Sequence, residues 1–221
     1  AFLILLFFAF HSQNFRLDAS SDTLILQNDE NFKYFNYYNN IFPSKNFLVL
    51  AIKSEKIIDI DYINKIKFIK KKLEKIKGIE SIFSIVDAPI LLLNNVKLTD
   101  LANKEIQTLN NNKIDINKAL NELSESPIFH NQIINTNKNV SSMIIYLKKD
   151  DNFYKIKKQK ENSFKSSNKE NILNSKNLEK KYRELKLKYE KNRKSLIQEI
   201  RDTLANENIP YKYFLGGIDM I

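Results

Sequence analysis

The chain has 221 residues, of which 43% are hydrophobic and 28% charged, and this balance excludes a globally disordered protein. Its net charge of +10 comes mostly from lysine, which accompanies heavy use of Asn and Ile, so we interpret the charge as a solvated surface shaped by coding bias. It has no cysteine for disulfides or thiolate metal sites, and only three glycines, Gly78, Gly216 and Gly217, too few for a phosphate-binding loop.

Residues 1–10, AFLILLFFAF, are uniformly apolar. As a helix they would extend about 15 Å, half of a hydrocarbon core that is ~30 Å thick. The basic segment and small-residue cleavage site of a signal peptide are not seen around them. We interpret residues 1–14 as the end of a transmembrane helix. The alternative is a buried core helix or strand.

Residues 15–28 are expected to be extended, followed by a short helix. Asn28 or Asp29 is the expected cap of this helix, and Pro43 ends it. An aromatic stripe along it is typical of core packing and consists of Phe32, Phe35, Tyr38 and Phe42. The candidates for contact with a hydrophobic substrate lie in the same dense aromatic segment and are Tyr34, Phe35, Tyr38 and Phe42.

The next three elements are a strand, a helix and a strand. NFLVLAI, residues 46–52, is an apolar run of strand length. Asp59 or Asp61 is expected to open a helix that ends at Gly78. Its expected apolar face consists of Ile63, Ile66, Leu73 and Ile76. IESIFSIV, residues 79–86, alternates as a strand does.

An insertion follows, and within it residues 98–125 are predicted to be helical in two pieces, broken around 110–113. Asp115 is the expected start of the second piece. SSMIIYLK, residues 141–148, is the third predicted strand. Residues 151–175 are polar with little periodicity, which leaves a frayed helix, a loop or an exposed arm open.

A long helix is predicted over residues 177–206. Its apolar stripe would cover the sheet of its own domain, or pair with the first arm, with a second loop domain or with another protomer. YKYFL, residues 211–215, is the fourth strand, and Gly216-Gly217 should break it. The stripe consists of Leu178, Tyr182, Leu185, Tyr189, Leu196, Ile200 and Leu204.

The order strand, helix, strand, insertion, strand, helix, strand is that of a ferredoxin-like split βαβ unit. We therefore expect an α+β fold with a helical insertion at 94–139 and a long helical hairpin or arm at 151–206. The expected domains are 1–14 as the end of a transmembrane helix, 15–45 as an extended segment and short helix, and 46–217 as the main domain.

Five stretches carry a family resemblance. FRLDASSDTL directly follows the apolar block, and the others are VDAPILL (86–92), SPIFHNQII (126–134), SSMIIYLK (141–148) and FLGGIDMI (214–221). Their order and spacing resemble the first large extracytoplasmic loop of bacterial exporters of the RND superfamily, in the MMPL-type branch. The chain departs from that pattern at 151–175, where it has Lys and Asn instead of more Ala, Glu and Arg.

The resemblance implies a porter domain in the periplasm, between transmembrane helices 1 and 2 of a protein of the bacterial inner membrane. Residues 218–221 would begin the second of these helices. The implied function is proton-driven export of a lipid-like or hydrophobic compound, with the proton-relay residues outside this chain. The implied partners are the lipid bilayer, the second porter loop of the same polypeptide, the substrate and a possible second protomer.

Three other classes of function remain as alternatives. The chain could be a membrane-tethered periplasmic binding or scaffold domain without transport activity. A nucleic-acid-binding domain is not favoured, because the central strands are mostly aliphatic and lack aromatics interleaved with Lys or Arg. An enzyme is not favoured either, because the sequence has no motif for a nucleophile, a metal or a cofactor.

Overall fold

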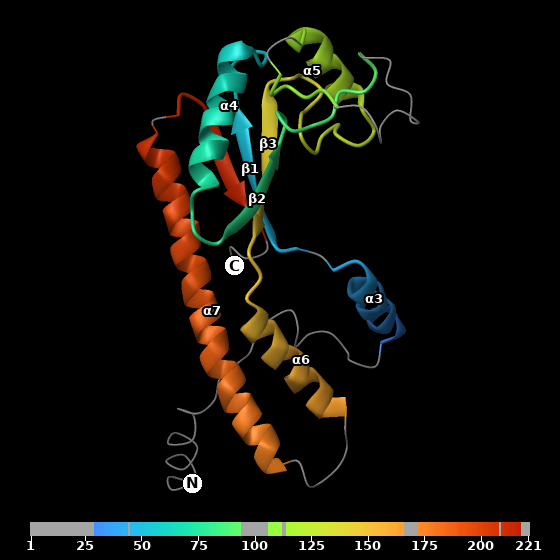
Figure 1. Ribbon diagram of the computed structural model, residues 1–221, viewed down its shortest axis with the longest axis vertical. Coiled ribbons are helices and arrows are strands. Elements are labelled where there is room, and N and C mark those ends of the chain that lie inside the picture. The colour runs from blue at the N-terminus through green and yellow to red at the C-terminus, as the bar shows by residue number, and fades with distance from the viewer. Residues whose placement is uncertain are drawn as a thin grey trace, which may run out of the picture. The chain divides into compact units, whose positions relative to one another are not determined.

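The computed structural model describes residues 29–43, 45–93, 106–111, 114–165, 172–207 and 209–217 (Figure 1). The chain divides into two compact units, Ala1–Ser44 and Lys45–Ile221. Among the residues that the structure describes, no helix is both long and apolar enough to cross a bilayer. The segments expected to lie in the membrane, 1–14 and 218–221, and the extended segment 15–28 lie outside the described residues.

The described part of the first unit is the helix α3, Glu30–Ile41. Asp29 caps it, because its carboxylate accepts a 2.9 Å hydrogen bond from the backbone N–H of Asn31. The helix ends just before Pro43, which cannot continue it. The predicted short helix is therefore confirmed, with Asp29 rather than Asn28 as its cap.

The second unit is built on a four-stranded sheet of β1 (Phe47–Lys53), β2 (Ile79–Ser84), β3 (Val140–Leu147) and β4 (Lys212–Gly216). The strand order is β2-β3-β1-β4, and each neighbouring pair is antiparallel. The α+β class is confirmed, with all four strands within two residues of the predicted ranges.

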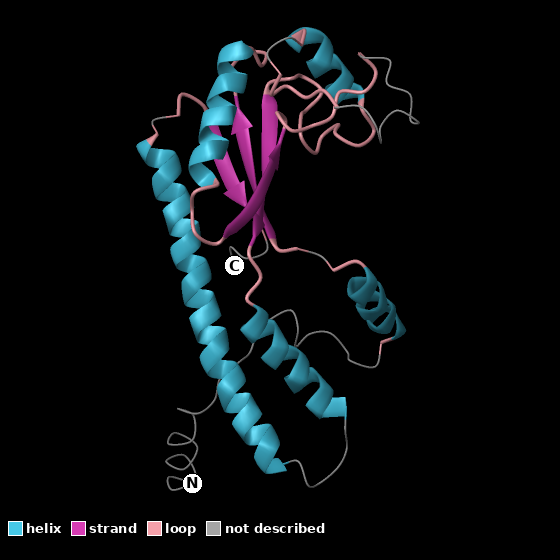
Figure 2. Ribbon diagram, in the orientation of Figure 1, coloured by secondary structure: helices cyan, strands magenta, loops and turns pink. Residues whose placement is uncertain are grey.

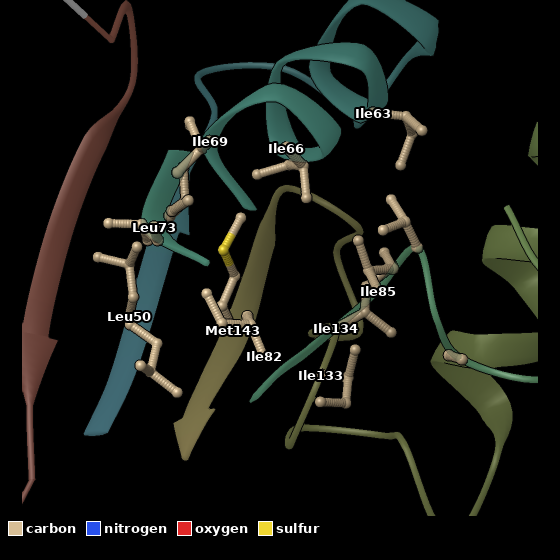
Figure 3. Close-up of a cluster of buried hydrophobic side chains, with 14 of the residues drawn as sticks. Leu50, Ile63, Ile66, Ile69, Leu73, Ile82, Ile85, Ile133, Ile134 and Met143 are labelled. Atoms are coloured by element: carbon tan, nitrogen blue, oxygen red, sulfur yellow. The ribbon is translucent and has the colours of Figure 1, made fainter. Parts of the chain in front are cut away.

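Two helices cover one face of this sheet (Figure 2). They are α4, Ile60–Leu73, and the C-terminal part of α7, Ile172–Asn206. Side chains alternate along β1, so Leu48, Leu50 and Ile52 point into the resulting core. Figure 3 shows Ile66, Ile69 and Leu73 of α4 above Leu50 and Met143 of the sheet.

The helix α4 begins as the sequence indicates but ends earlier. Asp59 is its N-cap and accepts a 2.9 Å hydrogen bond from the N–H of Tyr62. The prediction that Gly78 closes this helix is wrong. The chain tightens after Leu73 through i→i+3 hydrogen bonds, and Gly78, at a φ of 115°, turns the backbone into β2 instead.

The strand ends also differ slightly from the prediction. β2 stops at Ser84, because the backbone N–H of Asp87 donates to the carbonyl of Ser84 and forms a turn. Gly216 does not break β4, since it pairs with Val49 inside the ladder. Gly217, at a φ of 151°, is the residue at which β4 ends.

One helix of the insertion is confirmed and one is not. α5 covers Ile116–Glu125 and is capped by Asp115, as predicted. Of the earlier predicted piece, residues 106–109 are not helical, because Thr108 begins a turn held by hydrogen bonds with Asn110 and Asn111, at the predicted break. Residues 98–105 of that piece lie outside the described residues.

The segment between β3 and β4 forms two helices, α6 (Asp151–Lys165) and α7. The sequence left a frayed helix, a loop or an exposed arm open for residues 151–175. The structure shows that residues 151–165 form a helix. α7 begins five residues before the predicted position and runs without a break to Asn206. Together, α6 and the N-terminal part of α7 extend beyond the end of the sheet (Figure 1), and we call residues 151–194 the arm.

Candidate interaction surfaces and the arm joint

The face of the sheet opposite α4 and α7 is apolar and partly exposed. Its side chains alternate with those of the core, and we call this set the open face. Phe47 is 44% exposed and Phe214 is 65% exposed, whereas the others are half-buried. The open face consists of Phe47, Val49, Ala51, Phe83, Ile144, Tyr146 and Phe214.

The register of the strands places these side chains in three adjacent rows. Phe47 lies opposite Tyr146, and their rings meet edge to face at 6.4 Å between centroids. Val49 and Phe83 lie on either side of Ile144. Ala51 lies opposite Phe214. An apolar strip therefore crosses all four strands, which is a feature of surfaces that contact another protein or an apolar ligand.

In the arm, α6 and α7 pair through a second hydrophobic cluster, separate from the sheet core. Its centre is Phe153, whose ring stacks on Tyr189 at 4.5 Å and on Tyr182 at 5.9 Å. Lys160 lies over the Tyr182 ring at 4.1 Å and forms an ion pair of 3.1 Å with Glu179. Stacked rings therefore contribute to the arm cluster together with aliphatic side chains such as Ile156.

The arm joint is the set of hydrogen bonds where the arm meets the sheet. Asn46, directly before β1, donates one side-chain hydrogen to Tyr154 of α6 at 2.8 Å and one to Tyr189 of α7 at 3.0 Å. A primary amide has two such hydrogens, so Asn46 binds both helices at once. Its carbonyl accepts from the N–H of Leu147, which joins the start of β1 to the end of β3.

A second contact of the arm joint comes from Arg193. Its Nε donates to the Tyr189 hydroxyl at 3.1 Å, and one terminal nitrogen donates to the Lys148 carbonyl at 2.9 Å. The Lys148 N–H in turn donates to the Gly78 carbonyl at 2.8 Å. The side chain of Arg193 is buried, so these bonds lie where water cannot easily replace them. The joint therefore connects α7 with the ends of β2 and β3.

The apolar stripe predicted on α7 divides between the two clusters at this joint. Its first half packs in the arm, where Tyr182 is buried beside the partly buried side chains of Leu178, Leu185 and Tyr189. Its second half lies in the sheet core and consists of Leu196, Ile200 and Leu204. Two of the arrangements suggested by the sequence thus occur together in one helix, one on its own sheet and one with the first arm helix.

The aromatic residues of α3 do not lie where the sequence suggested. Core packing was expected for this stripe, but the side chains of Phe35, Tyr38 and Phe42 are 62%, 59% and 73% exposed. Tyr34 is also exposed, and Tyr37 meets Tyr38 edge to face at 5.5 Å. The expectation of core packing is therefore wrong for these residues, and the side chain of Phe32 lies outside those described. The rings remain available to an apolar ligand.

Two acidic residues with structural roles had no signal in the sequence. Glu122 of α5 accepts hydrogen bonds from the backbone N–H groups of Leu91, Leu92 and Leu93, at 2.5 to 3.0 Å. Asp87 binds the Lys70 ammonium and the N–H and hydroxyl of Ser84. Each carboxylate joins segments that are distant in the chain, so no local pattern identifies it.

The side chains of Tyr62 and Glu179 have pKa values that are shifted by their surroundings. Burial raises the pKa of the Tyr62 hydroxyl to about 12. This hydroxyl donates to the Ile52 carbonyl at 2.9 Å and lies 2.7 Å from Ser141 Oγ. Partial burial would raise the pKa of Glu179, but the hydrogen bonds and charges of Lys160 and Arg183 outweigh it and lower that pKa.

Within the described ranges, no three His, Asp or Glu side chains gather as a metal site would require. Comparison of the chain with models of known protein families, with characterised proteins and with solved structures found no match. The arrangement described above therefore has to be interpreted from its own geometry. It comprises an apolar open face, a jointed aromatic arm and an exposed aromatic helix, all of which are suited to contact with other molecules.

Proposed function

We propose that this chain is the first periplasmic porter domain of a proton-driven RND-type exporter that moves a lipid-like or hydrophobic compound out of the inner membrane. The basis is the ordered set of family-like stretches after an apolar segment, together with a domain suited to mechanical contacts. In this proposal the chain contributes movement and binding surfaces, and the proton-relay residues lie in other parts of the polypeptide.

The observation that carries the proposal is that the chain enters and leaves the sheet at one end. Asn46 directly precedes β1 and Gly217 follows β4, and a Cβ atom on Gly217 would lie 3.0 Å from the carbonyl oxygen of Phe47. A domain that loops out of a membrane between two spanning helices needs its two connections close together. A domain held by a single tether has no such requirement.

The finer description of the fold belongs to the same proposal. We assign the sheet to the ferredoxin-like type, on the basis of its strand order β4-β1-β3-β2 and the helices α4 and α7 on one face. The porter domains of the RND superfamily are built on such units. The arm would then be an insertion between β3 and β4 that lengthens the second helix.

Two surfaces take roles in this proposal. The open face is assigned to contact with the second porter loop of the same polypeptide, because it is apolar, spans four strands and is only partly exposed. The exposed rings of Tyr34, Phe35, Tyr38 and Phe42 are assigned to the hydrophobic substrate. Both assignments rest on apolar exposure.

The first experiment is to read the gene on both sides of the segment encoding this chain and to count the apolar spans of ~20 residues. About a dozen spans with a second large loop would support the exporter. A single span followed by a stop codon would contradict it, and the chain would then be a tethered binding or scaffold domain. Export of a hydrophobic dye by the complete protein, compared with a deletion strain, would test the activity itself.

A further inference from the structure

Nearly all of the net charge of the chain is concentrated in the arm. Residues 151–194 contain 15 Lys and Arg against six Asp and Glu, a net +9 out of the +10 of the whole chain. Within residues 180–194 alone, eight cations accompany two anions. Coding bias toward lysine would distribute charge along the whole chain, so the concentration in one structural element requires another explanation.

Many of these cations lie on the outside of the arm, whereas Arg193 is buried in the arm joint. The inward side of α7 carries Tyr182, Leu185 and Tyr189, which pack on α6. On the other side, exposed Arg183 forms an ion pair with Glu179, whereas the exposed lysines named below form no ion pair within the described ranges. Leu187 is 61% exposed in their midst. The outward-facing set consists of Lys155 and Lys158 of α6 and Lys180, Lys181, Lys188, Lys191 and Lys194 of α7.

The arm extends from the end of the sheet where both chain connections lie. Asn46, which directly precedes β1, binds Tyr154 and Tyr189 at the base of the arm. β4 ends at the same place, because Gly216 pairs with Val49 in β1. From Arg193 to the start of α7 the arm is roughly 30 Å long, at 1.5 Å per residue. A domain connected to a membrane through this end would place its arm on the membrane side (Figure 1).

We propose that the arm docks on the anionic phospholipid headgroups of the bilayer to which the domain is connected. The inference rests on the proposed function in that residues 1–10 lie in this bilayer. Lysines near an anionic surface are each attracted within a Debye length of about 8 to 10 Å, and exposed lysines on one element add together. The exposed Leu187 would reach the interface between the headgroups and the acyl chains.

The test uses the absence of cysteine, which allows one dye to be attached to the full chain at a chosen site. Leu187→Cys places the dye on the arm, and Ile57→Cys places it beyond the opposite end of β1, at 62% exposure against 61% for Leu187. Vesicles of phosphatidylcholine, with or without phosphatidylglycerol, carry a quencher on the headgroups. We expect the dye at position 187 to be quenched, but not the dye at position 57. Quenching at 187 should occur only when the vesicles contain phosphatidylglycerol, and it should disappear in ~1 M salt.

A matched pair of variants then identifies the charges responsible. Lys188→Gln with Lys191→Gln removes two exposed charges from the arm, and Lys53→Gln with Lys212→Gln removes two exposed charges from the far end of the sheet. For the arm variant, quenching should be lost at roughly half the salt concentration that abolishes it for the parent protein. The control variant should need the same salt concentration as the parent.

The outcomes separate this inference from the proposed function. The count of apolar spans in the gene tests the proposed function separately, because a single span followed by a stop codon contradicts the exporter whatever the arm does. Equal quenching at 187 and 57, or no response to phosphatidylglycerol, overturns docking of the arm whether or not the chain is anchored. A dye at 187 that responds to a single-stranded oligonucleotide and not to phosphatidylglycerol would overturn the lipid assignment in favour of nucleic acid.

Discussion

The side-chain amide of Asn46 donates a 3.0 Å hydrogen bond to the hydroxyl of Tyr189, although the two residues are 143 positions apart in the chain. The same amide nitrogen binds the Tyr154 hydroxyl at 2.8 Å. One uncharged residue before the first strand therefore holds both helices of the arm against the sheet. Because α7 passes through both the arm cluster and the sheet core but α6 packs only in the arm cluster, this joint determines how firmly the arm is held at the end of the sheet.

Replacing Asn46 with Leu keeps the size of the side chain but removes both donors. We expect the arm to loosen by about 2 kcal/mol, since each lost hydrogen bond contributes about 1 kcal/mol. Faster hydrogen–deuterium exchange in α6 and in residues 177–192 of α7, with the strands unchanged, would show this. Asn192→Leu makes the same chemical change at an exposed site of α7. Equal exchange in the two variants would contradict a role for the joint.

Gly78→Ala should destabilise the sheet unit. Its φ of 115° disfavours any side chain, and a Cβ atom would lie 3.2 Å from Leu196 Cδ2 in the core. We expect a loss of about 1 to 3 kcal/mol in the free energy of unfolding, measured by urea denaturation. Gly216→Ala is the control, because nothing lies within 4 Å of its Cβ position and its φ is not in the positive range. A similar loss in both variants would contradict the argument.

Stability should fall at alkaline pH, and Tyr62 should contribute to that fall. Its pKa is raised from 10.0 to about 12 by burial, so the folded state retains a proton that the unfolded state has lost. This contribution is fully present below pH 10 and disappears as the pH rises through about 12. In urea denaturation from pH 8 to 11, Tyr62→Phe should weaken the pH dependence above 10. An unchanged slope would show that other groups cause it.

The open face should matter for export and little for folding. Phe214→Asp places a charge on a side chain that is 65% exposed, so the melting temperature should change little. If the second porter loop covers this face, export of a hydrophobic dye by the complete protein should fall at least tenfold, because the charge would be buried in the contact. Ile57→Asp, at 62% exposure beyond the end of β1, should leave export unchanged. Equal effects would contradict this contact.

Local patterns in the sequence predicted most of the regular elements. The caps Asp29, Asp59 and Asp115 were each visible as acidic residues before an amphipathic run, and each caps a helix. The strand ranges followed from apolar runs of the right length. Segments of low periodicity were less informative, and α6 is helical because Phe153 and Ile156 pack on α7, a contact outside the local sequence.

The residues that connect distant segments could not be predicted. Asn46 and Asp87 lie outside helices and strands and Glu122 lies in α5, and each has a partner that is distant in the chain. The aromatic residues of α3 illustrate the opposite difficulty, since a stripe at helical spacing is compatible with either a buried or an exposed face. Only the packing of whole elements distinguishes these cases.

The place of β1 in the sheet has a consequence for how the protein folds during synthesis. β1 is made first but lies between β3 and β4, and β4 is the last of the four strands to leave the ribosome. One side of β1 therefore exposes unpaired N–H and C=O groups until the rest of the unit, including the arm, has been made. The arm has mostly local contacts and can form early, whereas closure of the sheet should be the slow step. Aggregation of incomplete chains is the corresponding risk.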